Sequence, residues 1–328
     1  MLLNHSNRLY MPEGEYYISD IIAEQNKDFR HQYTFLKKDF SFTSYVNHSV
    51  LNNVDMYAIT TKSGHFTVLP GSYERHTKEL KTNSISTLEV GDDLLLAGCY
   101  PDVKDFILLR ASQDLCEVEY FELNEDLAQI FAIYSLYGTT ANTSSSDIVI
   151  RDIKKEHLSD GAILFIKNFG GVVLSNISSS STTYTIKITD PLFVSFFVDN
   201  ASDIMYMINL SPRSVIKAYL DIYFDTQRKG DELSLRRYTG SIIKNILFSR
   251  FGIISEFNYE EHSFKFNDFM LNLEAVPMHE RYKDVIKIND AFSVYKDEIV
   301  SIKKSSGSAV NVLIEDQSDS RLIADNIF

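Results

Sequence analysis

MYAITTKSGHFTVLP, residues 56–70, is a pair of short β-type runs on either side of a Ser-Gly turn signal. The β-branched and aromatic residues favour strands, and a small polar residue followed by glycine favours a tight turn between them. Residues 88–95, LEVGDDLL, place a second turn signal at Gly91-Asp92, directly before another apolar strand. This order of strands and turns predicts a β-rich domain.

The C-terminal segment 297–328 has the same texture, with β-branched runs that read DEIVSIKK and AVNVLIED. Together the two regions cover about a third of the chain, and they resemble the Hint fold that inteins share with hedgehog autoprocessing domains. The resemblance implies that both chain ends build one β domain. We therefore expect a Hint-like domain at 41–120 and 286–328, an N-terminal extension at 1–40 and an inserted domain at 121–285.

The insertion has the pattern of an α/β domain that repeats, at about 125–200 and about 205–285. The first repeat opens with a helix pattern that is apolar on nearly every side, and the second opens at Ser211-Pro212, since serine caps free amides and proline suits the first turn. The expected elements are a helix at 126–138, a strand at 147–151, a helix at 153–169, strands at 172–177 and 183–188, a helix at 213–224, a hairpin tip at 229–231 and a helix at 241–251 with Gly252 as C-cap.

Residues 210–225, LSPRSVIKAYLDIYFD, and RFGI at 250–253 resemble the second motif helix and a later segment of LAGLIDADG homing endonucleases. Residues 133–141, IYSLYGTTA, are similar to the first motif. The resemblance implies an α+β fold with a pseudo-twofold αββαββα insertion, in which the two motif helices pack together. It also implies that an acidic residue at the foot of each helix binds a divalent metal, which activates water for DNA cleavage.

On this sequence the two metal positions fall at Thr140 and Gln227. A hard cation in a nuclease site needs anionic oxygen ligands, and neither residue supplies one. Asp225 is the residual catalytic candidate if the register shifts by two residues; the alternative is that its carboxylate caps the helix end. The sequence therefore leans against an enzyme, and we expect no metal or cofactor, with Mg²⁺ bound only if nuclease activity persists.

Inteins need particular residues for protein splicing, and at most of the corresponding positions this chain has a different residue. Met1 stands where the family has Cys or Ser, and Leu69 and Ser72 stand where Thr and His belong in the second block. Asn326 lacks the His that precedes it in the family, and the C-terminal segment is expected to be a closing strand of the β domain. His76 is either a displaced substitute or a surface histidine. Without a group to protonate the leaving amide, splicing is not expected.

The formal net charge of −13 argues against a general polyanion binder, because affinity for nucleic acid rests on Lys and Arg. Between Ser211 and Arg250, however, eight Lys or Arg stand against four acids, so a DNA-facing surface is expected there and on the strand near 148–151. The alternative is an ordinary solvated face. The candidate DNA-binding residues are Arg151, Arg228, Lys229, Arg236, Arg237 and Tyr238.

Three functions fit these observations. The first is non-cleaving binding of double-stranded DNA by a LAGLIDADG-like saddle. The second is a structural or assembly subunit of a larger viral or nucleic-acid-processing complex, which the acidic charge suits. The third is an active endonuclease with an unusual metal site at Asp225. The sequence has two cysteines, no secretion signal and no long apolar run, which predicts a cytoplasmic, reducing location without a membrane segment. A virus-encoded origin is consistent with the resemblance.

Overall fold

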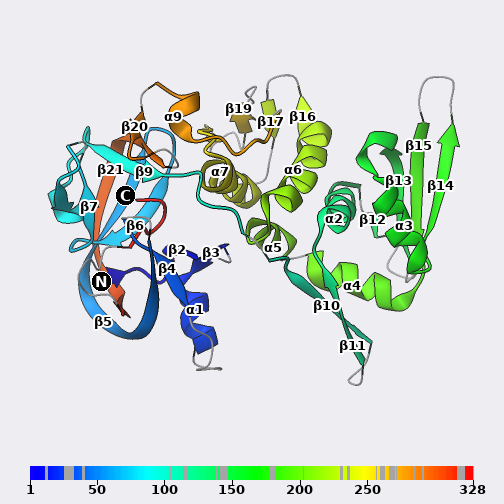
Figure 1. The fold of residues 1–328 in the computed structure, drawn as a ribbon, viewed down its shortest axis with the longest axis horizontal. Helices are drawn as coiled ribbons and strands as arrows, with labels where there is room; N and C mark the ends of the chain where they lie inside the picture. The colour runs from blue at the N-terminus through cyan, green and yellow to red at the C-terminus, as the bar shows by residue number, and fades with distance from the viewer. Residues whose placement is uncertain are drawn as a thin grey trace. The chain divides into compact units, whose positions relative to one another are not determined.

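A computed structural model describes residues 1–11, 14–25, 33–38, 41–77, 79–103, 105–113, 117–137, 139–140, 147–177, 182–201, 203–229, 232–234, 237–255, 257–258, 263–265, 270, 272–283, 285–289, 292–315 and 322–327. The chain divides into two compact units. Unit 1 combines Met1–Asp102 with Arg236–Phe328, and unit 2 is Val103–Leu235. Figure 1 shows the helices and strands of each unit. Both ends of the chain therefore build one unit, and the middle of the chain builds the other.

Unit 1 is organised around two long antiparallel strands, β5 (Phe42–Thr61) and β21 (Ser293–Ile314), which pair over most of their length. The sheet is completed by β1 (Leu2–Leu3), β4 (Thr34–Leu36), β6 (Phe66–Pro70), β9 (Asp93–Ala97) and β20 (Val285–Lys287). The predicted hairpin of residues 56–70 is formed by the end of β5 and by β6. Gly91 has φ +95°, the left-handed conformation that favours glycine in the predicted turn before β9.

The other described elements of unit 1 are β2 (Arg8–Met11), β3 (Gly14–Tyr17), α1 (Ile18–Gln25), β7 (Glu74–His76), β8 (Thr82–Ser84), η1 (Ile85–Thr87), α7 (Arg237–Phe251), β18 (Phe257–Asn258), β19 (Ser263–Lys265) and α9 (Met278–Arg281). Helix α7 ends at Gly252, as predicted, where φ is +63°. The N–H of Ile253 bonds to the Leu247 carbonyl at 2.8 Å, and the N–H of Gly252 bonds to the Phe248 carbonyl at 3.0 Å. These two bonds form the glycine-dependent cap that satisfies the last helical carbonyls.

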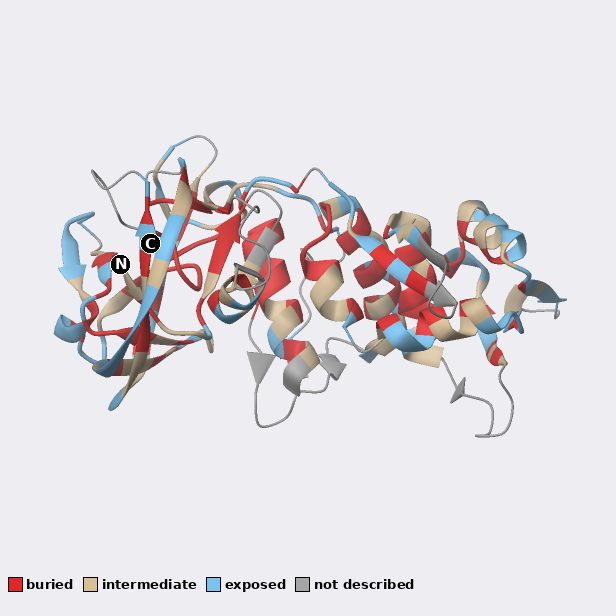
Figure 2. Cartoon of the chain, turned by 90° about the horizontal axis from the view of Figure 1, so that it is seen from below, coloured by how far each residue is buried: buried red, intermediate tan, exposed pale blue. Residues whose placement is uncertain are grey.

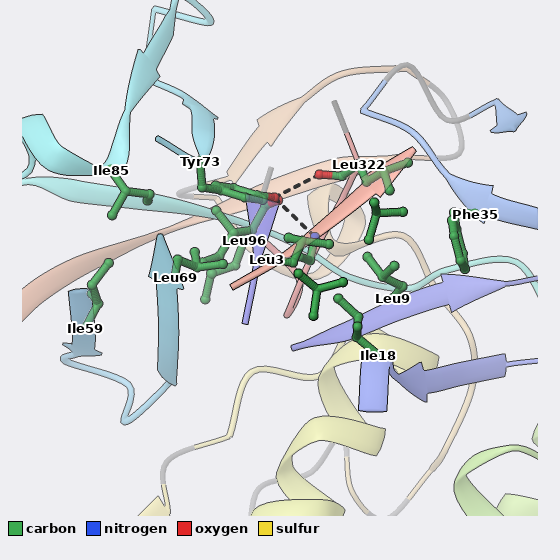
Figure 3. Close-up of a cluster of buried hydrophobic side chains, with 14 of the residues drawn as sticks. Leu3, Leu9, Ile18, Phe35, Ile59, Leu69, Tyr73, Ile85, Leu96 and Leu322 are labelled. Carbon is green, nitrogen blue, oxygen red and sulfur yellow. Dashed lines mark hydrogen bonds between the residues drawn. The ribbon is translucent and has the colours of Figure 1, made fainter. Parts of the chain in front are cut away.

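The core of unit 1 joins the two ends of the chain. Leu3 and Leu9 are almost fully buried and belong to one apolar cluster with Leu69 and Leu322 (Figure 3). The described part of residues 1–40 is therefore part of the β domain, which corrects the expectation of a separate N-terminal extension. This segment has no clear sequence period because its partners are strands and turns far along the chain.

Unit 2 contains a four-stranded antiparallel sheet in the order β12-β13-β15-β14. Its strands are β12 (Thr139–Thr140), β13 (Ile148–Lys154), β14 (Val172–Ile177) and β15 (Thr182–Ile188). Two hairpins are formed by β10 (Leu108–Gln113) with β11 (Glu117–Glu122) and by β16 (Arg228–Lys229) with β17 (Glu232–Ser234). The helices are α2 (Glu125–Tyr137), η3 (Lys155–His157), α3 (Asp160–Asn168), α4 (Pro191–Ala201), α5 (Ile204–Asn209) and α6 (Arg213–Gln227).

Helices α2 and α6 pack along each other and form the centre of unit 2. Figure 2 shows the buried residues in red. A phenylalanine cluster adds α4 to this core, with Phe196 packed against Phe131 of α2 and Phe121 of β11 at ring-centroid distances of 5.8 and 5.2 Å. In the described parts of both units, no helix has the length and apolarity to cross a membrane.

The predicted helix at 153–169 is wrong in its first half. Strand β13 continues to Lys154, because Ile153 pairs with β15 across an irregularity in the register. Helix α3 begins only after Ser159, whose Oγ accepts a hydrogen bond from the Ala162 N–H at 3.0 Å. Helices α4 and α5 have no counterpart in the sequence prediction. The first of them reads PLFVSFFVDNA, which is too uniformly apolar to give a helical period.

The two units differ from the expected domains at both ends of the insertion. Residues 103–120 fall in unit 2, where the β10–β11 hairpin packs beside α4. Residues 236–285 fall in unit 1, where the buried Arg250 of α7 lies 3.0 Å from the Asp102 carboxylate. The expected second repeat, about 205–285, is thus divided between the units. Local sequence patterns predict elements, whereas the choice of core depends on contacts distant in sequence.

Candidate functional site

The foot of helix α6 carries Asp225, the residual catalytic candidate. Its side chain is 53% exposed, and its Oδ2 accepts a bond from the Lys154 ammonium and lies 2.8 Å from Nε2 of His157. The hydrogen bond from Lys154 is the largest cause that lowers the pKa of the Asp225 carboxyl, and His157 acts in the same direction. The described partners of this carboxylate are therefore basic side chains of β13 and η3.

The other two expected metal positions lie near the same end of the helix pair. Gln227 is the last residue of α6, and Thr140 ends β12. Helices α2 and α6 approach each other here, with the Tyr137 hydroxyl 3.3 Å from Oγ1 of Thr226. Among the described residues, no group of three or more His, Cys, Asp or Glu is placed to hold a metal ion. Asp225 meets two basic groups, an arrangement that does not supply the cluster of oxygen ligands Mg²⁺ prefers.

The β12-β13-β15-β14 sheet has two chemically different faces. Ile148 and Ile150 of β13 and Ile186 and Ile188 of β15 are buried, so the residues between them point outward. The register places Val172, Leu174 and Asn176 of β14 on the same outward face. The outward positions of the three longer strands are Val149, Lys154, Val172, Leu174, Asn176, Thr183, Thr185 and Lys187. These positions carry hydroxyls, an amide, cations and apolar groups, while exposed Asp152 on β13 and Asp147, the partner of Lys187, place carboxylates beside them.

Two cations accompany this outward face. Arg151 is exposed at the point where the β13–β15 register is irregular. The Lys187 side chain is 49% exposed and its ammonium lies 3.3 Å from the Asp147 carboxylate. The Asn176 amide donates to Oγ1 of Thr185 at 3.0 Å, so the polar side chains of β14 and β15 meet across the strands.

The remaining predicted DNA-binding residues do not form one strand. Arg228 and Lys229 are exposed and make up β16. Arg237 and Tyr238 are the first residues of α7, which begins four residues earlier than the predicted start at 241, and they belong to unit 1. Arg236 lies outside the described residues. The candidates are therefore divided between the units, whereas the sequence analysis placed them on one DNA-facing surface.

The positions expected for the second splicing block have different surroundings. Leu69 is fully buried in the core and Ser72 is exposed. Tyr73, which the sequence analysis did not single out, reaches the C-terminal segment: its hydroxyl donates to the Leu322 carbonyl at 2.8 Å and accepts from the Ala324 N–H at 3.2 Å (Figure 3). A single tyrosine gives no sequence signal for such a role, because its partners are defined only by the fold.

A buried carboxylate, Asp325, connects the C-terminal turn to the N-terminal part of the chain. It accepts hydrogen bonds from Asn7 Nδ2 at 2.7 Å, from Thr67 Oγ1 at 2.7 Å and from the Arg8 N–H at 2.8 Å. Asp325 and Asn326 have φ values of 48° and 65°, and isolated β-bridges flank them. Residues 322–327 thus form a turn held by isolated bridges, where the sequence predicted a closing strand.

His76, the suggested substitute for the splicing histidine, lies in β7. Its Nδ1 is 3.1 Å from the Leu80 carbonyl oxygen, in the turn that joins β7 to β8. This exposed local contact favours the interpretation of His76 as a surface histidine.

A cavity of about 790 Å³ lies within unit 1. Helix α7 contributes Lys244 and Asn245 to its wall, the β5–β6 hairpin contributes His65, and the C-terminal turn contributes Asn326. The Asn326 amide donates to Oδ1 of Asn245 at 3.1 Å, which ties the turn to the helix. Among the described lining residues, Arg8 and Lys244 are the fully charged ones and none is acidic. The lining therefore carries two cations, of which Arg8 is paired with the Asp325 carboxylate at 3.5 Å.

Three residues of the cavity wall hold buried polar atoms that have no hydrogen-bond partner in the described structure. They are Nε2 of His65, Oγ of Ser255 and Oδ1 of Asn326. A buried donor or acceptor without a partner costs about 1–3 kcal/mol. These atoms are shielded from solvent, and a bound molecule that reached them would gain hydrogen bonds.

The His65 ring is neutral at ordinary pH. Burial is the largest cause that lowers its pKa, to about 3, and the nearby charges of Lys244 and Arg8 act in the same direction. A hydrogen bond to the backbone of Asp325 acts in the opposite direction. Because Nε2 has no partner, Nδ1 makes this bond as a donor, which leaves Nε2 as an acceptor.

Of the comparisons with known proteins, the one with solved structures gives matches. A scan against protein-family models finds no match, and neither does a search of the curated proteins. Among solved structures, the chain is similar to the gp41-1 intein, with 15% identity, a TM-score of 0.23 and coverage of 37% of this chain and 78% of the intein. A triple-substituted form of that intein gives 16% identity, a TM-score of 0.22 and coverage of 37% and 80%. With scores this low, the description of the fold rests on the topology of the chain itself.

Proposed function

We propose that this protein binds double-stranded DNA through the outward face of the β12-β13-β15-β14 sheet and does not cleave it. The observation that carries the proposal is the contrast between the two faces of this sheet. Buried isoleucines fill the inward positions of β13 and β15, while the outward positions carry threonines, Asn176, Lys187 and the exposed apolar residues Val172 and Leu174. Cations position a protein on phosphates, and short polar side chains hydrogen-bond to base edges.

The exposed cations extend this surface. Arg151 lies on β13 itself, and Arg228 and Lys229 are exposed in unit 2. The chain as a whole has a net charge of −13, so its affinity would depend on this local distribution and would fall steeply with salt.

Lack of cleavage is supported by the environment of Asp225. Its carboxylate is held by Lys154 and His157, and Thr140 and Gln227 offer no second carboxylate. Lack of splicing is supported in the same way by Leu69, which lies in the core. We therefore interpret the protein as an intein-like and homing-endonuclease-like chain in which both chemistries are lost.

The proposal is tested by fluorescence anisotropy of a labelled random duplex titrated with the full chain at several salt concentrations. Binding is expected at low salt, with a linear dependence of log affinity on log salt. Arg151→Ala combined with Lys187→Ala is expected to weaken binding and to reduce the salt slope by about 2, one unit for each lost phosphate contact. The same duplex should stay intact with Mg²⁺.

A matched double variant distinguishes the loss of contacts on this sheet face from the loss of two positive charges anywhere in unit 2. Lys155 and Lys167 are also exposed lysines of unit 2, in η3 and α3. Lys155→Ala with Lys167→Ala removes the same charge and is expected to leave the slope unchanged. Equal loss in both double variants, or no binding by the wild-type chain, would reject the proposed surface. Mg²⁺-dependent plasmid relaxation that disappears in Asp225→Asn would favour the endonuclease instead.

The acidic net charge favours one other function, that of a structural or assembly subunit. Purification of the full chain from its native source tests this directly. A stoichiometric protein partner together with no DNA affinity would support the assembly role and contradict the DNA-binding proposal.

A further inference from the structure

The cavity of unit 1 has three kinds of wall, and each selects a different part of a ligand. Phe66, Phe248 and Tyr295 supply aromatic surface, and Leu96 and Ile254 add aliphatic surface. At about 790 Å³ the cavity has the size and the largely apolar lining typical of small-molecule sites. Phe66 is 57% exposed, so an aromatic ring remains accessible at this wall.

The charged part of the wall selects for an anion. Arg8 comes from β2 and Lys244 from α7, and no acidic residue joins them in the described lining. Arg8 also lies 3.5 Å from the Asp325 carboxylate, and the Lys244 ammonium donates to the Ser63 carbonyl. These contacts hold both cations in place at the cavity.

The unpartnered polar atoms select for hydrogen-bond donors. His65 Nε2 and Asn326 Oδ1 are both acceptors, and Ser255 Oγ accepts or donates. A bare anion would satisfy neither acceptor. A ligand that fits all three walls must therefore carry an aromatic body, hydroxyl or amino donors and an anionic group.

We propose that this cavity is a binding site for a nucleotide, with the phosphate at Arg8 and Lys244, sugar or base donors at His65 and Asn326, and the base against the aromatic wall. The site is built from unit 1 residues and does not depend on the sheet proposed to bind DNA. A nucleoside and inorganic phosphate each satisfy only part of this wall.

Isothermal titration calorimetry of the full chain with adenosine monophosphate tests the site. Binding is expected in the micromolar to low millimolar range, and adenosine and inorganic phosphate should each bind at least tenfold more weakly. Lys244→Met should weaken adenosine monophosphate at least tenfold. Lys303→Met, which changes an exposed lysine of β21 away from the cavity, should have no effect.

Two further measurements keep the test decisive if Lys244→Met does not fold. Ser255→Ala removes a hydroxyl that has no described partner and should weaken the nucleotide by several fold. In the wild-type chain, the imidazole nitrogen signals of His65 should shift with adenosine monophosphate. Three outcomes would overturn the nucleotide site. They are no binding of adenosine monophosphate at millimolar concentration, equal affinity for inorganic phosphate alone, and unchanged affinity in both variants. Duplex binding in the anisotropy assay is independent of each of these outcomes.

Discussion

The foot of α6 in unit 2 and the C-terminal turn in unit 1 each hold an aspartate beside basic side chains, but in opposite environments. The Asp225 side chain is 53% exposed and its partner Lys154 is 44% exposed. The Asp325 side chain is 6% exposed and accepts hydrogen bonds from three other residues. Exposed ion pairs contribute little, whereas removal of a buried partner leaves unpaired groups out of water. The same residue type is thus expected to be replaceable in one unit and structural in the other.

The strongest test of this contrast is Asp325→Ala. The substitution leaves Asn7, Thr67 and Arg8 without their shared acceptor, and it is expected to lower the free energy of unfolding by about 3–5 kcal/mol. Urea unfolding followed by circular dichroism measures the change. Asp325→Asn keeps one acceptor oxygen and should cost less. A loss below about 1 kcal/mol for Asp325→Ala would show that the network is not structural.

The next effect is expected at Tyr73, whose hydroxyl holds the same C-terminal segment. Tyr73→Phe keeps the buried ring and removes the bonds to the Leu322 carbonyl and the Ala324 N–H, at an expected cost of about 1–3 kcal/mol. Amide hydrogen exchange at Ala324 should become faster in the variant. Unchanged stability and exchange would mean that water replaces the hydroxyl at no cost.

A pH dependence is expected from His65. Its folded pKa of about 3 lies below the ordinary value of about 6.5, so the unfolded chain binds a proton between these values and the folded chain does not. Stability is therefore lost as pH falls from about 6.5 toward 3, by about 2 kcal/mol at pH 5. Urea midpoints at pH 7 and pH 5 measure this loss. His65→Gln should reduce it, and an equal loss in the variant would assign the effect to other groups.

The smallest effect is expected at Asp225. Asp225→Asn should change stability by less than about 1 kcal/mol, because its partners stay solvated. The lowered pKa of Asp225 means that this small contribution is present above the ordinary carboxyl range and is lost on acidification. Asp221→Asn, on the same helix and paired with Lys217, is the matched control. A loss of several kcal/mol at Asp225 alone would remove the contrast between the two aspartates.

Local patterns predicted many elements because their causes are local. The hairpin of residues 56–70, the glycine cap of α7 and the strands at 172–177 and 182–188 follow from turn chemistry and residue type. Helix α4 was not predicted, because the short apolar run PLFVSFFV does not by its period distinguish a helix from a buried strand. The start of α7 was misplaced because RRYTG carries neither a strong cap nor an apolar period.

The candidate sites were predicted unevenly for the same reason. Asp225 was singled out by position in a motif, but its partners Lys154 and His157 lie about 70 residues away. The cavity of unit 1 had no sequence signal at all. His65 sits in a hairpin turn, Lys244 in a helix and Asn326 in a terminal turn, and each residue is ordinary in its own segment.

The sequence by itself determined the β character of both chain ends, the pair of long helices in the middle and the lack of carboxylates at Thr140 and Gln227, because these depend on residue type and on spacing within a few turns. The tertiary structure alone decided that apolar side chains in the described part of residues 1–40 enter the core, that α7 joins unit 1 and that Asn7 meets Asp325, 318 positions along the chain. Burial depends on which distant segments exclude water from one another, and local sequence patterns do not predict which segments pack together.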